Sequence, residues 1–286
     1  MLRRALRLLL PLAALLACAS CTGLDWLNAP VPTWGYQRTT DLPYGSDPRQ
    51  KLDIYVPTHA TANTPVVIFF YGGEWMMGDK HDFRFVAQGL TSRGFIAVIP
   101  NYRLYPQVTF PAFVQDGALA FRWTRQHITQ FGGNSQRIYL MGHSAGAYIA
   151  AFLTLDNHYL ADVGLDRECI RATACIAGPF NFYPYVEDLG IFNMHPGDLK
   201  PDPKIEPVNF VDGKEPPMLF IQGMKDGVID ARNSFEMADL IYHAGGNSRL
   251  IYYPDQGHIT ILMALAFEFR WFAPVLHDTV HFFREN

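Results

Sequence analysis

Short apolar runs alternate with helix-periodic segments along most of the chain, and this alternation constrains the fold more than any other feature of the sequence. The clearest run, residues 65–71 (PVVIFFY), is continuous, β-branched and aromatic, as expected of a strand buried on both faces. Similar runs lie at residues 95–99, 137–141, 172–177, 218–222 and 250–253. The segments between them predict helices at 83–92, 111–130, 145–155, 231–243 and 274–284. Because parallel strands need crossover connections, this order predicts an α/β fold with a mostly parallel central sheet and helices on both faces.

Composition allows a large buried core. The chain has 286 residues, 49% of them hydrophobic and 17% charged, and we expect one domain over residues 36–286. Residues 178–217 are rich in proline and aromatic side chains and fit neither period, which predicts a small insertion above the sheet. The formal net charge is −4 without a basic stripe, so nucleic acid is not expected as a partner. Cys169 and Cys175 are too few for a disulfide framework, and we expect buried thiols.

Residues 1–17 form a separate segment. Three arginines precede the apolar run 8–17, which has the length of a signal peptide and is shorter than the roughly 20 residues of a membrane-spanning helix. Cys18 follows Leu-Leu-Ala, which resembles a bacterial lipoprotein cleavage site, and Cys21 is a second candidate for lipidation. We therefore expect an exported protein, periplasmic or anchored to a membrane by lipid, with residues 18–35 as a tether. Plain secretion with incidental cysteines is the alternative.

Residues 139–151 (YLMGHSAGAYIAA) place a Gly-His-Ser-Ala-Gly sequence between a predicted strand and a predicted helix. A side chain at Gly142 or Gly146 would crowd so tight a turn, and the turn pushes the Ser144 hydroxyl out at the end of the strand. A serine hydroxyl is a weak nucleophile at neutral pH, so it needs a base and a third group that orients the base. The motif indicates a nucleophilic Ser144, with an ordinary hydroxyl in a glycine-rich loop as the alternative.

His258 and Asp226 are the candidates for these two partners. His258 follows the strand at 250–253, in the loop 254–258, with a glycine beside it. Asp226 lies just past the strand at 218–222, and Asp230 competes with it from a position nearer the next helix. The order Ser144, Asp226, His258 is the one expected of an α/β-hydrolase triad.

A serine hydrolase also needs backbone N–H groups directed at the negative oxygen of its tetrahedral intermediate. Residues 71–75 (YGGEW) put a glycine pair directly after the strand at 65–71. The N–H groups of this loop, together with that of Ala145 at the start of the following helix, predict an oxyanion hole.

Five motifs in order, YGGEW, NYRL (101–104), GHSAG, GMKDGV and DQGH, resemble the α/β-hydrolase carboxylesterases. The resemblance is to bacterial feruloyl-esterase-like, hormone-sensitive-lipase-like and kynurenine-formamidase-like groups, and it covers residues 36–286. It implies an α/β-hydrolase fold with the insertion over the active site. It implies a catalytic triad of Ser144, Asp226 and His258 and an oxyanion hole formed by the N–H groups of Gly73, Glu74 and Ala145. Such an enzyme hydrolyses small-molecule esters through an acyl-enzyme and needs no cofactor or metal.

The chain departs from this family pattern at two positions. Tyr71 stands where the family usually has a histidine that braces the oxyanion loop, so the brace here is either different or looser. Glu74 stands where many members have a small residue, and we expect its carboxylate to point away from the hole. We expect Arg103 and Asp116, which recur in the family, to form a structural pair.

The insertion carries a group of aromatic residues that suggests an apolar or aromatic acyl pocket, although packing of the insertion onto the sheet explains them equally well. These residues are Phe180, Phe182, Tyr183, Tyr185 and Phe192.

Three other functions compete with the esterase prediction. An amide hydrolase of the aryl-formamidase type would use the same residues. A binding protein on this fold would normally lack a triad residue, whereas all three are present. His277 and His281 lie four residues apart on one predicted helix, as in a zinc site, but the glutamate of a zincin and a third ligand are missing from the sequence nearby.

Overall fold

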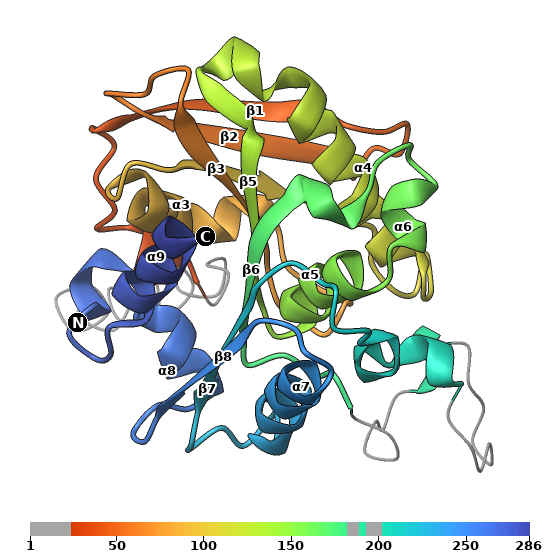
Figure 1. Ribbon diagram of the computed structural model, residues 1–286. Helices are drawn as coiled ribbons and strands as arrows, with labels where there is room; N and C mark the ends of the chain where they lie inside the picture. The colour runs from red at the N-terminus through yellow and green to blue at the C-terminus, as the bar shows by residue number, and fades with distance from the viewer. Residues whose placement is uncertain (1–23, 182–188, 193–201) are drawn as a thin grey trace, which may run out of the picture.

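The computed structural model describes residues 24–181, 189–192 and 202–286, and its centre is one sheet of eight strands (Figure 1). The strands lie in the order β1-β2-β4-β3-β5-β6-β7-β8. Their bounds are β1 (Tyr36–Pro43), β2 (Lys51–Pro57), β3 (Thr64–Phe70), β4 (Ile96–Pro100), β5 (Gly133–His143), β6 (Ile170–Ile176), β7 (Met218–Gly223) and β8 (Ser248–Tyr253). Strand β2 runs antiparallel to β1 and β4, and all other neighbours are parallel. The predicted mostly parallel sheet is confirmed.

All six predicted strands are present, but β2 was missed. Its sequence, KLDIYVP, places Asp53 inside the apolar run, and a charged residue there argues against a buried strand. Asp53 is nevertheless fully buried, because Lys80 and Arg38 pair with its carboxylate. Strand β1 forms one edge of the sheet, beside β2.

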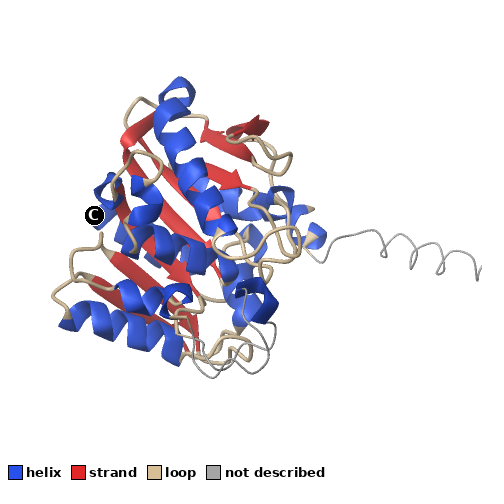
Figure 2. Cartoon of the chain, turned by 90° about the vertical axis from the view of Figure 1, so that its right-hand side faces the viewer, coloured by secondary structure: helices blue, strands red, loops and turns tan. Residues whose placement is uncertain are grey.

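Helices cover both faces of the sheet, as predicted (Figures 1 and 2). Helices α3 and α9 pack together on one face, and α4 packs with α5 on the other. The helices are α2 (Asp25–Asn28), α3 (Arg84–Thr91), α4 (Ala112–His127), α5 (Ala145–Leu155), α6 (His158–Ala161), α7 (Arg232–His243), α8 (His258–Met263) and α9 (Val275–Glu285). The short helices α2, α6 and α8 were not predicted, because four to six residues are too few to show a period.

The described part of the insertion consists of short 3-10 helices, η4 (Leu189–Phe192), η5 (Pro203–Ile205) and η6 (Pro207–Phe210). The insertion is bound to helix α5, because the Tyr148 hydroxyl of α5 donates to the carbonyl of Ile205 at 2.6 Å.

Several predictions fall on residues outside the described ranges. They are the leader 1–17, the lipidation candidates Cys18 and Cys21, and the aromatic residues Phe182, Tyr183 and Tyr185. Among the residues that the structure does describe, no helix has the length and apolar character needed to cross a membrane.

Candidate functional site

Ser144 lies at the turn between β5 and α5, with an unfavourable backbone conformation for a residue that has a side chain. Its φ is 53° and its ψ is −124°. A Cβ on Gly142 would come within 2.3 Å of the Gly146 carbonyl oxygen, and a Cβ on Gly146 within 2.0 Å of the Phe70 carbonyl oxygen. The turn therefore requires glycine on both sides of Ser144, as the sequence predicted.

The structure brings together the three side chains proposed as the triad. Ser144 Oγ lies 2.9 Å from His258 Nε2, and His258 Nδ1 lies 2.9 Å from Asp226 Oδ2. A carboxylate only accepts hydrogen bonds, so Nδ1 of His258 carries a hydrogen and the neutral ring leaves Nε2 free to accept from the Ser144 hydroxyl. His258 is the first residue of α8, not a loop residue as expected, so the start of a helix fixes its backbone.

Asp226 is held as an ionised acceptor. Its Oδ1 accepts the backbone N–H groups of Val228 and Ile229, each at 2.8 Å, and its Oδ2 accepts from Gln222 Nε2 at 3.0 Å. Burial by itself would raise the pKa of Asp226, but the hydrogen bonds from His258 and these backbone groups outweigh it and lower that pKa.

The competing candidate, Asp230, is exposed and pairs with Arg232 at 3.0 Å. Gln222 was not anticipated as part of the site. Its side chain is fully buried and bridges Asp226 to Ser234 Oγ, which lies 3.0 Å from Gln222 Oε1. A polar residue in the apolar run 218–222 was the sequence signal for it.

The loop after β3 has the conformation expected of an oxyanion loop. Gly73, Glu74 and Trp75 all have positive φ, at 130°, 55° and 57°. Within the described chain, no acceptor takes the N–H groups of Gly73, Glu74 or Ala145, so these donors are available to a substrate oxygen. The Glu74 side chain is exposed to solvent.

Tyr71 braces this loop through a buried polar network. Its hydroxyl donates to Asn101 Oδ1 at 2.7 Å and accepts from Arg49 Nη2 at 2.9 Å, and Arg49 Nη2 also donates to the Gly78 carbonyl at the far end of the loop. The ring stacks on Phe83 with a centroid distance of 4.9 Å. Tyr71 therefore contacts the loop through a polar network of its own at the position where the family usually has histidine.

Asn101 extends the network to the end of the loop. Its Oδ1 accepts the Lys80 backbone N–H at 2.7 Å, and its Nδ2 donates to Asp79 Oδ2 at 2.7 Å. Asn101 lies in the NYRL motif, whereas Arg49 lies in a polar stretch whose sequence does not indicate a role at the site.

His143, next to Ser144 in sequence, forms a hydrogen bond with the backbone of His258. Its Nε2 lies 3.0 Å from the carbonyl oxygen of His258, which can only accept, so Nε2 carries the hydrogen. Burial, together with the neighbouring His258, lowers the pKa of His143 to about 3, so its ring is neutral at any working pH. The sequence gave His143 no role.

Trp75, in the loop after β3, packs against three other aromatic side chains. The Trp75 ring is 5.0 Å from Tyr148, 5.7 Å from Phe113 and 5.3 Å from Phe192, measured between centroids. Phe192 is buried within this group of aromatic rings. Phe180 packs instead on Phe220 of β7 and supports the alternative expectation of simple packing.

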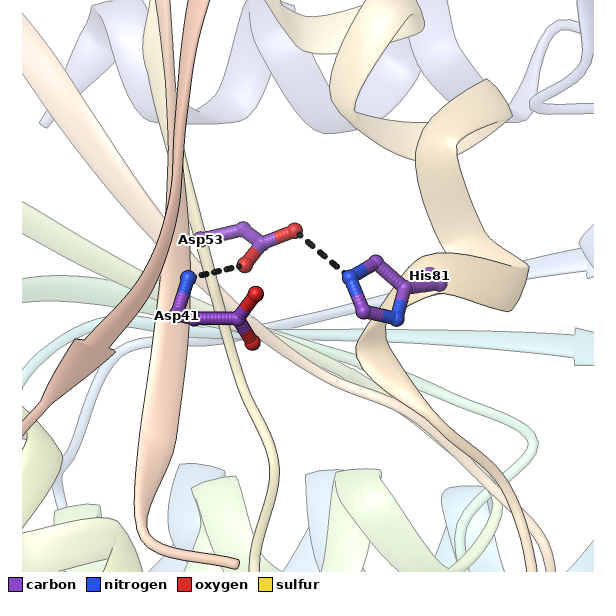
Figure 3. Close-up of side chains that lie close together, drawn as sticks. All are labelled: Asp41, Asp53 and His81. Carbon is purple, nitrogen blue, oxygen red and sulfur yellow. Dashed lines mark hydrogen bonds and ion pairs between the residues drawn. The ribbon is translucent and has the colours of Figure 1, made fainter.

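Asp41, Asp53 and His81 form the one group of potential metal ligands that we find in the described ranges (Figure 3). Lys80 Nζ lies 2.7 Å from Asp41 Oδ1 and 3.0 Å from Asp53 Oδ1. Arg38 Nη2 lies 2.7 Å from Asp53 Oδ2. Because two cationic side chains already neutralise these carboxylates, a metal ion would be repelled there. The group is a salt-bridge cluster that joins β1 and β2 to the segment after the oxyanion loop.

The zinc-like pair His277 and His281 has no third ligand within the described residues, and His281 pairs with Glu285 at 3.0 Å. The expected structural pair is present, with Arg103 Nη2 2.7 Å from the fully buried Asp116. The remaining expectation concerned the cysteines: Cys169 and Cys175 are free, Cys175 is buried, and Cys169 is half-buried.

Comparison with known proteins places these features in context. The chain matches the family model BD-FAE over residues 52–200. It is 30% identical over 242 residues to isoprenylcysteine alpha-carbonyl methylesterase of Arabidopsis thaliana, a match that covers 77% of this chain and 56% of that protein. A kynurenine formamidase of Danio rerio is 29% identical over 148 residues, which are 52% of this chain and 48% of that protein. The solved structure of esterase B from Lactobacillus rhamnosis has a TM-score of 0.77 at 21% identity and covers 96% of this chain and 94% of its own. The chain spans about half the length of the curated relatives that it matches.

Proposed function

Because the chain belongs to the BD-FAE family and has the α/β-hydrolase fold, we propose that it is a carboxylesterase-type serine hydrolase. Its substrates are small to medium acyl or aryl esters. One observation carries the proposal: Ser144 Oγ, His258 and Asp226 are joined by two hydrogen bonds of 2.9 Å, beside unpaired backbone N–H groups. These are the parts that acyl transfer requires.

The mechanism follows from this geometry. His258 Nε2 takes the Ser144 proton as Oγ attacks the ester carbonyl, and Asp226 stabilises the imidazolium that forms. The N–H groups of Gly73, Glu74 and Ala145 donate to the oxyanion. His258 then gives the proton to the leaving alcohol, and water repeats the sequence on the acyl-enzyme. The Ser144 proton leaves with the alcohol, and the proton that the attacking water gives to His258 returns to Ser144 Oγ as the acid is released, so the cycle needs no cofactor.

Amide hydrolysis of the aryl-formamidase type is the second candidate, favoured by the match to a kynurenine formamidase. The same residues would serve it, and the two activities differ in the leaving group to which His258 gives its proton, an alcohol in one and an amine in the other. The third reading, a non-catalytic binding protein, predicts that Ser144 does not react.

A fluorophosphonate probe tests the proposal directly. It should label Ser144 of the purified protein, and the folded Ser144→Ala variant should stay unlabelled and lose hydrolysis of p-nitrophenyl acetate. Equal labelling of both proteins would refute the assignment. Comparing feruloyl and p-nitrophenyl esters with N-formylkynurenine then separates esterase from formamidase.

We also propose that the protein is exported and tethered to a membrane through a lipid on Cys18, with Cys21 as the second candidate. The support is the leader sequence alone, with its arginines, apolar run and following cysteine. Cys18→Ala should move the protein from the membrane fraction to the soluble fraction. If the distribution does not change, Cys21→Ala distinguishes lipidation at Cys21 from plain secretion.

A further inference from the structure

We infer that four exposed apolar side chains around the proposed active site bind an extended apolar group of the ester substrate. The inference rests on the proposed function and adds a substrate class to it. The four side chains, called the apolar rim below, are more than half exposed in every case: Met77, Met224, Val228 and Ile259. Large apolar side chains that stay exposed beside the proposed catalytic residues are candidates for contact with the substrate.

Met77 lies on the oxyanion loop, three residues after Glu74. Its Cγ is 3.2 Å from the position that a Cβ on Gly73 would take, so the Met77 side chain lies directly against the loop that carries the proposed donors. Its backbone N–H donates to the Gly73 carbonyl at 3.0 Å, which fixes this position.

Met224 and Val228 flank the proposed acid, two residues before and two residues after Asp226. The backbone N–H of Val228 donates to Asp226 Oδ1 at 2.8 Å, so Val228 is anchored to the triad itself. Ile259 follows His258 in the first turn of α8. The oxyanion loop, the loop that carries Asp226 and the first turn of α8 therefore each contribute to the apolar rim.

Four buried aromatic rings are packed together beside the oxyanion loop. Trp75, Tyr148, Phe113 and Phe192 are buried and touch ring to ring, with centroids 5.0 to 5.7 Å apart where they meet Trp75. Close-packed aromatic rings resist insertion. A group too large to enter among these rings must extend outward, across the apolar rim.

The charges near the rim favour a neutral substrate. Lys225 is the one lysine or arginine in the loops that carry the rim, and it pairs with Asp255 at 2.7 Å. Glu74, which is exposed on the oxyanion loop, would repel an anionic substrate. An uncharged alkyl or aryl group meets neither obstacle.

The dependence of kcat/KM on the length of the substrate's alkyl chain measures this contact. Full transfer of one methylene from water to an apolar site favours binding by about fourfold, and a surface that covers only one side of the chain should give about twofold. We therefore expect kcat/KM to rise about twofold per methylene. One series uses p-nitrophenyl esters from acetate to decanoate, below their micelle concentrations. A parallel series uses acetates of 1-alkanols, so that the two series assign the apolar group to the acyl or to the alcohol side.

Variants that keep shape but add polarity test the named residues. The triple variant Met77→Gln, Val228→Thr, Ile259→Thr should lower the decanoate-to-acetate ratio of kcat/KM at least tenfold. The matched control Leu240→Gln, Tyr242→Gln changes two exposed apolar residues of α7, away from the site, and should leave that ratio unchanged.

The outcomes separate this inference from the proposed function. If the fluorophosphonate labels Ser144 but kcat/KM stays flat along both series, or if the triple variant keeps the wild-type ratio, the apolar rim is not a substrate surface and the hydrolase assignment stands. If Ser144 is not labelled, the proposed function fails first and this inference fails with it.

Discussion

Replacing Tyr71 with phenylalanine removes one buried hydroxyl from the base of the oxyanion loop and keeps the aromatic ring. That ring lies between Phe83 and Tyr102, with both centroid distances at 4.9 Å, so its stacking survives the substitution. The hydroxyl makes a hydrogen bond of 2.7 Å to Asn101 and accepts one of 2.9 Å from Arg49. The perturbation is therefore confined to these two polar contacts and a longer one of 3.4 Å to the Gly78 carbonyl.

The expected magnitude follows from these contacts. A neutral buried hydrogen bond contributes about 1 kcal/mol and one from a charged donor about 1.5 to 3 kcal/mol. Arg49 keeps its bonds to the carbonyls of Tyr102 and Gly78, and Asn101 keeps the Lys80 N–H. We expect the free energy of unfolding to fall by about 2 to 3 kcal/mol. Since full loss of one oxyanion donor costs about 10²- to 10³-fold in kcat, a loosened loop should cost about 10- to 100-fold.

Urea unfolding and steady-state hydrolysis of p-nitrophenyl acetate provide the two measurements, and KM should change by less than kcat. Tyr55→Phe is the matched control, because Tyr55 is fully buried on β2 and its hydroxyl has no hydrogen-bond partner in the described chain. Its kcat and stability should match the wild type. A Tyr71→Phe protein that is destabilised but retains wild-type kcat would refute the link between the network and the oxyanion loop.

Four further substitutions test the polar groups in and around the site. The unfolded chain binds a proton at His143 below about pH 6.5, whereas the folded chain does so only near pH 3. The free energy of unfolding therefore decreases as the pH is lowered, by about 2 to 3 kcal/mol between pH 7 and pH 4.5. His143→Gln, which can keep the Nε donor, should abolish this part of the pH dependence of urea unfolding; an unchanged slope would contradict it. Lys80→Met should cost about 3 kcal/mol in urea unfolding, because it removes a buried partner of Asp53, and a loss below 1 kcal/mol would contradict the buried-pair reasoning. Asp226→Asn should lower kcat by up to about 10⁴-fold, whereas Asp230→Asn should leave kcat unchanged; equal losses would reverse that choice.

The sheet and the positions of the proposed site were predictable because both depend on local patterns. An apolar run marks a parallel strand, and side chains just past such runs converge at one edge of the sheet. Ser144, Asp226 and His258 were found in this way although they are as far as 114 residues apart in sequence. An apolar run does not mark a strand that contains a charged residue, and β2 was missed because Asp53 interrupts its apolar run.

The supporting residues were not predictable, because each contacts the site across the fold and has no local signature. Arg49 reaches Tyr71 from a polar segment 22 residues earlier. His143 contacts His258 through the backbone carbonyl and through its ring, whose centroid lies 4.8 Å from that of His258, although the two residues are 115 positions apart in sequence. Such pairings follow from the final geometry of the chain, and sequence periodicity carries no information on them.

The buried polar groups near the site share one property that explains their presence in an apolar core. Tyr71 holds the oxyanion loop, Gln222 holds Asp226, and His143 holds the backbone of His258. Burying a polar group costs free energy unless the group is hydrogen-bonded, and each of these side chains makes the hydrogen bond named here. Each bond also fixes a different proposed catalytic group before substrate arrives, which is the arrangement that lowers a barrier most when charge develops in the transition state. Single substitutions at Tyr71, Gln222 and His143 should therefore lower kcat more than they raise KM, and an effect confined to KM would show that these residues shape substrate binding instead.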